Sequence, residues 1–176
     1  MKILAFAATN SRNSINKQLV TYATTLVQGA EVEVLDLNDF ELPLFSVDRE
    51  AEFGEPPALA QQFYSKIGAA DVLFISYAEH NGTYSAAYKN LFDWTSRIDK
   101  KVFQDKPMII MATSPGPGGA KNVLAQAKNS APHFAGEVLA DISVPRFREA
   151  FDTKTQTIKD PEIDTQLKLA IEALLK

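Results

Sequence analysis

The chain has no cysteine among its 176 residues. This absence excludes disulfide bonds, thiolate metal sites and cysteine nucleophiles. No apolar stretch approaches the ~20 residues that a membrane-spanning helix needs. The N-terminus enters an apolar run directly, without the charged segment and long apolar region of a signal peptide. We therefore expect a cytoplasmic protein that does not insert into a membrane.

The sequence also lacks runs of lysine and arginine, and its net charge is −4. A nucleic-acid surface needs clustered positive charge to neutralise phosphates, so we expect no nucleic-acid partner. Hydrophobic residues make up 45% and charged residues 23%, which is ordinary for a soluble globular protein. The length predicts a single domain, 1–176, with a substantial core.

Several motifs of enzyme active sites are missing as well. The chain contains neither G-x-S-x-G nor H-E-x-x-H, and its only histidines are His80 and His133. Glu79 and His80 have no third potential ligand nearby, so no metal site is predicted. Two interpretations of His80 stay open: it is either a group that tunes a bound ligand or a plain histidine, exposed to solvent or satisfied within the core.

Five apolar runs of strand length alternate with five amphipathic segments along the chain. The runs cover residues 2–8, 31–37, 71–76, 107–113 and about 138–144, and the predicted helices cover 16–28, 58–69, 85–97, 120–130 and 160–175. Ser14 and Asp160 are predicted helix caps, and Gly68 is predicted to end the second helix. Several runs are apolar on both faces, which favours a parallel sheet covered by helices on both sides. Residues 37–57 form one long irregular connection, of a length that is usually functional or interface-forming.

In such a doubly wound α/β sheet, ligands bind beyond the carboxyl ends of the strands, an edge that we call the rim. The three most distinctive stretches of the chain fall on it, after strands one, three and four. They are residues 9–16 (TNSRNSIN), 77–85 (YAEHNGTYS) and 114–119 (SPGPGG). This coincidence predicts a binding site formed by three corners.

The first corner has no glycine, and neither G-x-G-x-x-G nor the Walker pattern occurs. A helix N-terminus with hydroxyls, an amide and a cation around it suits a terminal monophosphate. Thr9, Ser11, Arg12, Ser14 and Asn16 supply those groups. The alternative is that Ser14 and its neighbours only cap a helix.

The other two corners suit a flat ring. Asn81-Gly82 predicts a tight turn with positive φ, which exposes backbone amides and carbonyls. Gly116, Gly118 and Gly119 would let a ring lie close against the backbone. The alternatives are a surface turn before a helix, with Phe92 and Trp94 in the core, and a plain strand-to-helix connection.

Together these corners resemble the NAD(P)H-dependent FMN reductase family. T-N-S-R-N-S-I-N is similar to the family's G-S-x-R-x-x-S-x-N, with Ser11 in place of its arginine and Arg12 one position later. A-E-H-N-G-T-Y-S-A-A-Y-K-N-L-F-D-W is similar to P-E-Y-N-x-S-x-P-G-x-L-K-N-x-x-D-W, with Ala78 for proline and His80 for tyrosine. The glycines of the third corner match S-x-G followed by G-G, and the likeness covers residues 1–130.

This resemblance implies a flavodoxin-like three-layer sandwich whose five-stranded parallel sheet has the order 2-1-3-4-5. It implies an FMN-dependent oxidoreductase that takes hydride from NADPH or NADH through flavin N5 and passes it to a small acceptor such as a quinone, an azo compound or free flavin. No catalytic side chain is then required. Family members are usually dimers or tetramers, and Tyr84, Tyr88, Phe92 and Trp94 are candidates for the subunit contact.

The site residues follow from the same resemblance. The phosphate would lie among Thr9, Ser11, Arg12, Ser14, Ile15 and Asn16, the isoalloxazine would border Ala78, Glu79, His80 and Asn81, and its other flank would meet Ser114, Pro115, Gly116, Gly118 and Gly119. Two other functions stay open: a flavodoxin-like electron carrier without pyridine-nucleotide activity, and a scaffold that has the fold but binds no flavin.

Overall fold

The structure, a computed structural model, describes residues 1–174. A five-stranded sheet forms its middle layer, in the order β2-β1-β3-β6-β7 with every neighbouring pair parallel. Its strands are β1 (Lys2–Ala8), β2 (Glu31–Leu35), β3 (Val72–Tyr77), β6 (Lys106–Thr113) and β7 (Gly136–Val144). Counted along the sheet's own strands, this order is 2-1-3-4-5, which confirms the predicted flavodoxin-like α/β fold.

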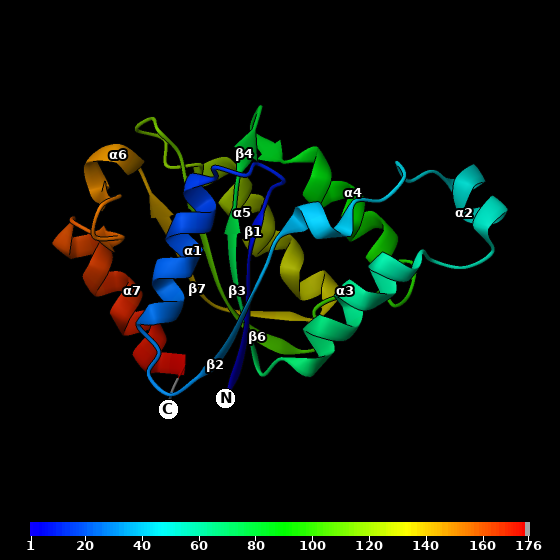
Figure 1. Ribbon diagram of the computed structural model, residues 1–176, viewed down its shortest axis with the longest axis horizontal. Coiled ribbons are helices and arrows are strands. Elements are labelled where there is room, and N and C mark those ends of the chain that lie inside the picture. Colours follow the sequence, from blue (N-terminus) through cyan, green and yellow to red (C-terminus); the bar gives the residue numbers. More distant parts are fainter. Residues whose placement is uncertain (175–176) are drawn as a thin grey trace.

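Helices cover both faces of the sheet (Figure 1). The long ones are α1 (Ile15–Thr25), α3 (Ala58–Ala69), α4 (Ala86–Thr95), α5 (Lys121–Ser130) and α7 (Pro161–Leu174). The end that the sequence predicted for the last helix, Leu175, lies outside the described residues. Within them, no helix combines the length and the apolar character that crossing a bilayer requires.

Strand β1 shows how one run of apolar residues forms two cores. Ile3 and Ala5 pack with α1 and α7, whereas Leu4, Phe6 and Ala8 pack with α3, α4 and α5. Successive side chains of a strand point to opposite faces, so a strand buried on both sides needs apolar residues throughout. This explains the unbroken run at the N-terminus.

The remaining elements are short. They are the hairpin β4 (Glu79–His80) and β5 (Thr83–Tyr84), the hairpin β8 (Phe151–Asp152) and β9 (Thr157–Ile158), the helices α2 (Val47–Phe53) and α6 (Phe147–Ala150), and the 3₁₀ turns η1 (Leu37–Phe40) and η2 (Ala131–Phe134). Two of them, η1 and α2, lie in the segment 37–57, so the prediction of an irregular connection there was wrong. Ser46 caps α2 by accepting from Arg49 N at 3.1 Å, and Gly54 ends it at φ 71°.

The prediction that Gly68 ends its helix was also wrong, since α3 runs through Gly68 to Ala69. A Cβ at Gly68 would lie 2.6 Å from Oε1 of Gln104. The Gln104 side chain therefore lies against this glycine, and its flexible amide end would have to move to accept a larger residue. The two predicted caps are confirmed, because Ser14 accepts from Lys17 N and Asp160 accepts from Glu162 N.

Asp36, just beyond β2, supplies a pH-dependent contact with α1. The Lys17 ammonium donates to its carboxylate at 2.7 Å, and this bond, with a second from Asn38 N, lowers the pKa of Asp36 from 3.8 to about 2. A depressed carboxyl pKa stabilises the fold above pH ~4, and that contribution is lost as the pH falls toward ~2.

We expect Asp36→Asn to cost about 1 kcal/mol at pH 7, since solvent screens this partly exposed pair. The asparagine keeps an acceptor for Asn38 N, so the substitution removes mainly the charge. Urea unfolding of both proteins between pH 2 and pH 7 measures the difference, which should shrink below pH ~4 and vanish near pH ~2. A difference that does not change with pH would contradict the role of the charge.

Candidate functional site

The first corner leads into the N-terminus of α1, where several backbone N–H groups have no acceptor in the described part of the protein. Ser14 is the N-cap, its Oγ accepts from Lys17 N at 3.2 Å, and the first turn contains no acidic residue. Within residues 1–174, none of the five backbone N–H groups of residues 12–16 donates a hydrogen bond to the protein. Unpaired N–H groups at the positive end of a helix dipole form a site for an anion.

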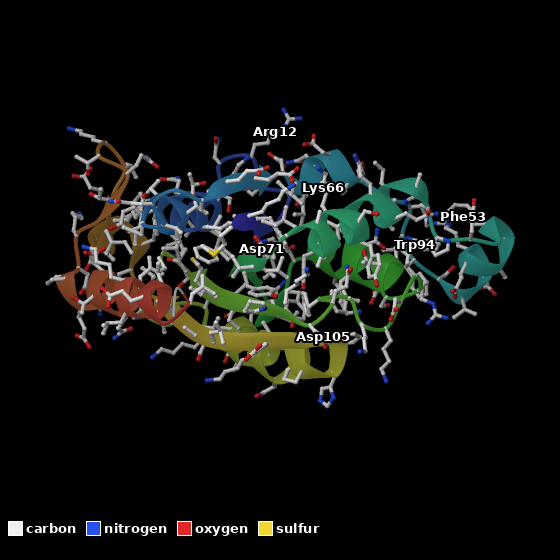
Figure 2. All side chains as sticks on the ribbon, turned by 90° about the horizontal axis from the view of Figure 1, so that it is seen from below. Arg12, Phe53, Lys66, Asp71, Trp94 and Asp105 are labelled. Atoms are coloured by element: carbon white, nitrogen blue, oxygen red, sulfur yellow. The ribbon has the colours of Figure 1, made fainter. Side chains whose placement is uncertain are left out.

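The side chains around these amides add further donors. Thr9 is buried, and its Oγ1 accepts from Ser11 N at 3.2 Å. Thr9 and Ser14 each accept one backbone N–H, so each hydroxyl proton remains available to a ligand. Ile15 is half-buried, Ser11 and Arg12 are exposed, and Figure 2 shows Arg12 pointing outward from the sheet. The corner thus offers neutral donors near the backbone and one cation at its outer edge.

Asn16 differs from its neighbours because its amide is turned into the protein. The residue is 3% exposed. Oδ1 accepts from Ser76 Oγ at 2.8 Å and from Thr113 N at 3.1 Å, and Nδ2 donates to Thr113 O at 3.4 Å. An amide has four hydrogen-bonding positions, so only one Nδ2 proton and the backbone N–H remain for a ligand.

The second corner is the β4–β5 hairpin. Asn81 and Gly82 form its turn with φ values of 52° and 83°, which confirms the predicted tight turn. Ala78, just before the hairpin, is buried, and His80 is exposed at its edge. Figure 1 shows β4 and the start of α1 at the same end of the sheet.

Glu79 links this hairpin to helix α5. Its Oε2 accepts from Val123 N in the first turn of α5 at 2.9 Å. α5 has no capping side chain of its own, because Ala120 stands at the cap position with φ 55°. A carboxylate 44 residues earlier in the chain therefore caps the helix.

We expect Glu79→Ala to destabilise the protein by about 1 kcal/mol, the usual cost of losing a helix cap. For a domain of this size that corresponds to a drop of roughly 2–4 °C in melting temperature. Glu79→Gln keeps one acceptor oxygen and should cost less. Glu172→Ala, at an exposed position on α7, is the control. Equal losses in Glu79→Ala and the control would contradict the capping role.

The third corner contains glycines in two different environments. A Cβ on Gly116 or Gly118 would meet no atom within 4 Å, so both leave open space along the rim. Gly119 has φ 59°, and a Cβ there would lie 2.3 Å from Ser143 Oγ. Gly119 is thus needed for the turn itself, whereas Gly116 and Gly118 leave room for a ligand. Ser114 Oγ donates to Gly116 O within the same loop, and Pro115 is exposed.

Residues 145–147, directly after β7, support the third corner, and the sequence reasoning missed them. Arg146 N donates to Gly116 O at 2.9 Å, and Phe147 N donates to Ser114 O at 3.1 Å. The segment directly follows β7, so the position of β7 beside β6 brings it there. Its one local signal is Pro145, which marks the end of the strand.

Three tyrosines pack together at the second corner, two from the corner itself and one from α4. Tyr77 and Tyr88 are buried, with their hydroxyls 3.5 Å apart, and the Tyr84 ring packs on both. Burial raises the pKa of all three phenols, that of Tyr88 well above 10. These three phenols are therefore uncharged at neutral pH.

The strand order, the helix N-terminus with unpaired N–H groups after β1 and the glycine-rich loop after β6 are features of a flavodoxin-like protein. A family model for NADPH-dependent FMN reductases matches residues 1–147. The chain belongs to this family, whose members use FMN with NAD(P)H.

Individual relatives agree with this assignment. The chain is 28% identical over 175 residues to a probable NADPH:quinone oxidoreductase 2 of Oryza sativa subsp. japonica, covering 96% of this chain and 84% of the relative. It is 27% identical over 163 residues to an NAD(P)H-dependent FMN reductase of Pseudomonas aeruginosa, covering 91% and 86%. Among solved structures, FerB, a flavoenzyme NAD(P)H:(acceptor) oxidoreductase of Paracoccus denitrificans, superposes with a TM-score of 0.79 at 22% identity, covering 98% of this chain and 93% of FerB. FerB supports the fold.

Proposed function

We propose that this chain binds FMN at the rim and transfers reducing equivalents from NADPH or NADH to a small acceptor. The observation that carries the proposal is that, within the described residues, none of the five backbone N–H groups of residues 12–16, at the start of an eleven-residue helix, has a protein acceptor. A phosphate dianion is the ligand that this arrangement favours most strongly. The open backbone at Gly116 and Gly118 lies on the same edge and suits a flat ring.

The proposed contacts follow the three corners. The phosphate binds at the first corner: Thr9, Ser11, Arg12, Ser14, Ile15 and Asn16. The ring lies between the second and third corners: Ala78, Glu79, His80 and Asn81 on one side, and Ser114, Pro115, Gly116, Gly118 and Gly119 on the other. Of these, Glu79 acts through α5, since its carboxylate is already engaged by Val123 N.

The flavin supplies the hydride chemistry when it is bound. The residues of the chain bind and orient it: the backbone amides of the first corner neutralise the phosphate, and the two loops set the plane of the ring. His80 is exposed at the edge of the hairpin, where it can contact an acceptor. No catalytic side chain is proposed.

The acceptor is proposed to be a quinone, an azo compound or free flavin. The relatives include quinone oxidoreductases and an FMN reductase, and a structural neighbour is an azoreductase. These three acceptors share a flat conjugated system that can stack on an open ring. Turnover with each of them under identical conditions would rank them.

An anaerobic titration tests the proposal. The protein is mixed with FMN, its visible spectrum is recorded, and NADPH or NADH is added. We expect flavin binding followed by bleaching of the flavin band. Bound flavin that does not bleach would favour the electron carrier, and absence of binding would favour the scaffold.

We also propose that residues 1–176 act as one cytoplasmic FMN-binding domain that associates into dimers or tetramers. The contact surface suggested by the sequence needs correction, because Tyr88 and Trp94 are buried inside the chain itself. The segment around α2 instead exposes Leu44 (72%), Val47 (73%) and Phe53 (45%). Sedimentation measures the mass, and a monomer with full flavin occupancy would refute this part of the proposal.

A further inference from the structure

The Asn16 amide joins parts of the rim that are far apart in sequence. Ser76 lies near the end of β3, and Thr113 is the last residue of β6. The three hydrogen bonds of Asn16 therefore connect the start of α1 with segments 60 and 97 residues away. Thr113 extends the connection, since its Oγ1 donates to Val144 O, at the end of β7, at 2.7 Å.

The amide of Asn16 takes the place of a strand backbone. The pairing of β3 with β6 ends at Tyr77 and Ala112, one residue before Thr113. Asn16 then accepts from Thr113 N and donates to Thr113 O, as a neighbouring peptide group would. Both backbone groups of Thr113 are buried, so leaving them unpaired would be costly.

We infer that Asn16 is a positioning residue, which sets the distance between the phosphate corner and the two ring corners. The inference deepens the proposed FMN site and rests on it. Ala78 follows Ser76 by two residues, and Ser114 follows Thr113 directly. A shift of Asn16 therefore moves the first residues of both loops that border the ring. The backbone N–H of Asn16 itself belongs to the phosphate corner.

Riboflavin separates this role from direct phosphate binding, because it has the ring of FMN but no phosphate. If Asn16 positions the ring corners, its removal lowers the affinities for FMN and for riboflavin by a similar factor. If its side chain serves only the phosphate, riboflavin affinity stays unchanged.

We expect Asn16→Leu, which leaves three buried polar groups without partners, to lower the affinity for both flavins about 30-fold. Ser76→Ala removes one of the three bonds from a side chain that is 0% exposed and cannot touch a ligand. It should lower both affinities about fivefold. The double variant should bind as Asn16→Leu does, since Ser76 acts through Asn16.

The measurements are fluorescence titrations with FMN and riboflavin, together with the visible spectrum of bound FMN, which reports the ring environment. Asn129→Leu, an exposed position on α5, is the matched control and should leave both affinities unchanged. Loss of FMN affinity alone, or unchanged affinities in Ser76→Ala, would overturn the inference.

Hydrogen exchange of the flavin-free protein gives a second readout. Ser76→Ala should speed exchange at the backbone amides of residues 78–81, 114 and 116 and leave α7 unaffected. Wild-type protein that binds no flavin would refute the proposed function, whereas the exchange result still decides whether Asn16 positions these loops. Unchanged exchange in both loops would overturn the inference by itself.

Discussion

Ser14→Asp is expected to fold normally and to lose FMN. Aspartate is as good an N-cap as serine, so its carboxylate can accept from Lys17 N in place of Ser14 Oγ. It also complements the helix dipole, and stability should stay equal or rise by a few tenths of a kcal/mol. The same carboxylate occupies the place proposed for the phosphate.

The size of the effect follows from the charges. A carboxylate and a phosphate dianion at ~4 Å repel by several kcal/mol even in a partly solvated site with an effective dielectric constant of ~20. A loss of about 3 kcal/mol already exceeds a hundredfold change in affinity. We therefore expect FMN affinity to fall at least a hundredfold, measured by titration of flavin fluorescence.

Two controls isolate the charge at the phosphate corner. Riboflavin has no phosphate, so its affinity should change little in Ser14→Asp. Ser46→Asp makes the same substitution at the N-cap of α2, where Ser46 accepts from Arg49 N. This variant should keep its FMN affinity. FMN binding within a few-fold of wild type in Ser14→Asp would show that the phosphate binds elsewhere.

The parts of the site that could be predicted from sequence depend on local chemistry. Ser14 caps the helix that it precedes, and Asn81-Gly82 turns the chain through positive φ, both through atoms within a few residues. The cap and the turn are visible in a window of about ten residues. The parallel sheet with helices on both faces could be predicted because its strands are apolar throughout and alternate with helical segments. Its strand order followed only from the resemblance to the FMN reductase family.

Other features depend on contacts that only the fold creates. Glu79 caps a helix 44 residues later, and Asn16 replaces a strand that ends at Tyr77. Gly68 has the sequence environment of a helix end, but α3 continues past it to Ala69, beside the side chain of Gln104. In each case a partner far along the chain adds a contact that the local sequence does not reveal.

The helix α2 as a whole could not be predicted from its own sequence, because a residue far along the chain holds it in place. None of the residues of α2 is buried, so no apolar periodicity announces the helix. It is attached through the ring of Trp94, which stacks on Phe53 at 5.6 Å and meets Phe45 edge-on at 5.1 Å. Figure 2 shows Phe53 and Trp94 side by side. The partner that anchors α2 thus lies about forty residues further along the chain, on α4.

Trp94→Ala is accordingly expected to have the largest effect on stability. The side chain is 0% exposed, and its Nε1 donates to Pro43 O at 2.7 Å. Removing a buried tryptophan costs about 3–5 kcal/mol, which lowers the melting temperature of a domain of this size by roughly 10 °C. Trp94→Phe keeps an aromatic ring but loses the hydrogen bond, so it should cost about half as much.

Trp94→Ala should also loosen one particular part of the protein, the segment that carries α2, and not only lower the overall stability. With the ring gone, the segment that carries α2 retains the Asn90 bonds to Leu42 O and Phe45 N and the pair of Arg97 with Glu50. These bonds are partly exposed and cannot replace a buried aromatic contact, so α2 should become sensitive to proteolysis well below the melting temperature.

Phe53→Ala, which removes a ring that is 45% exposed from the same stack, should release α2 while lowering the melting temperature much less. Trp94→Ala with a melting temperature within 3 °C of wild type (less than about 1.5 kcal/mol), or with α2 as resistant to protease as before, would contradict this anchoring role.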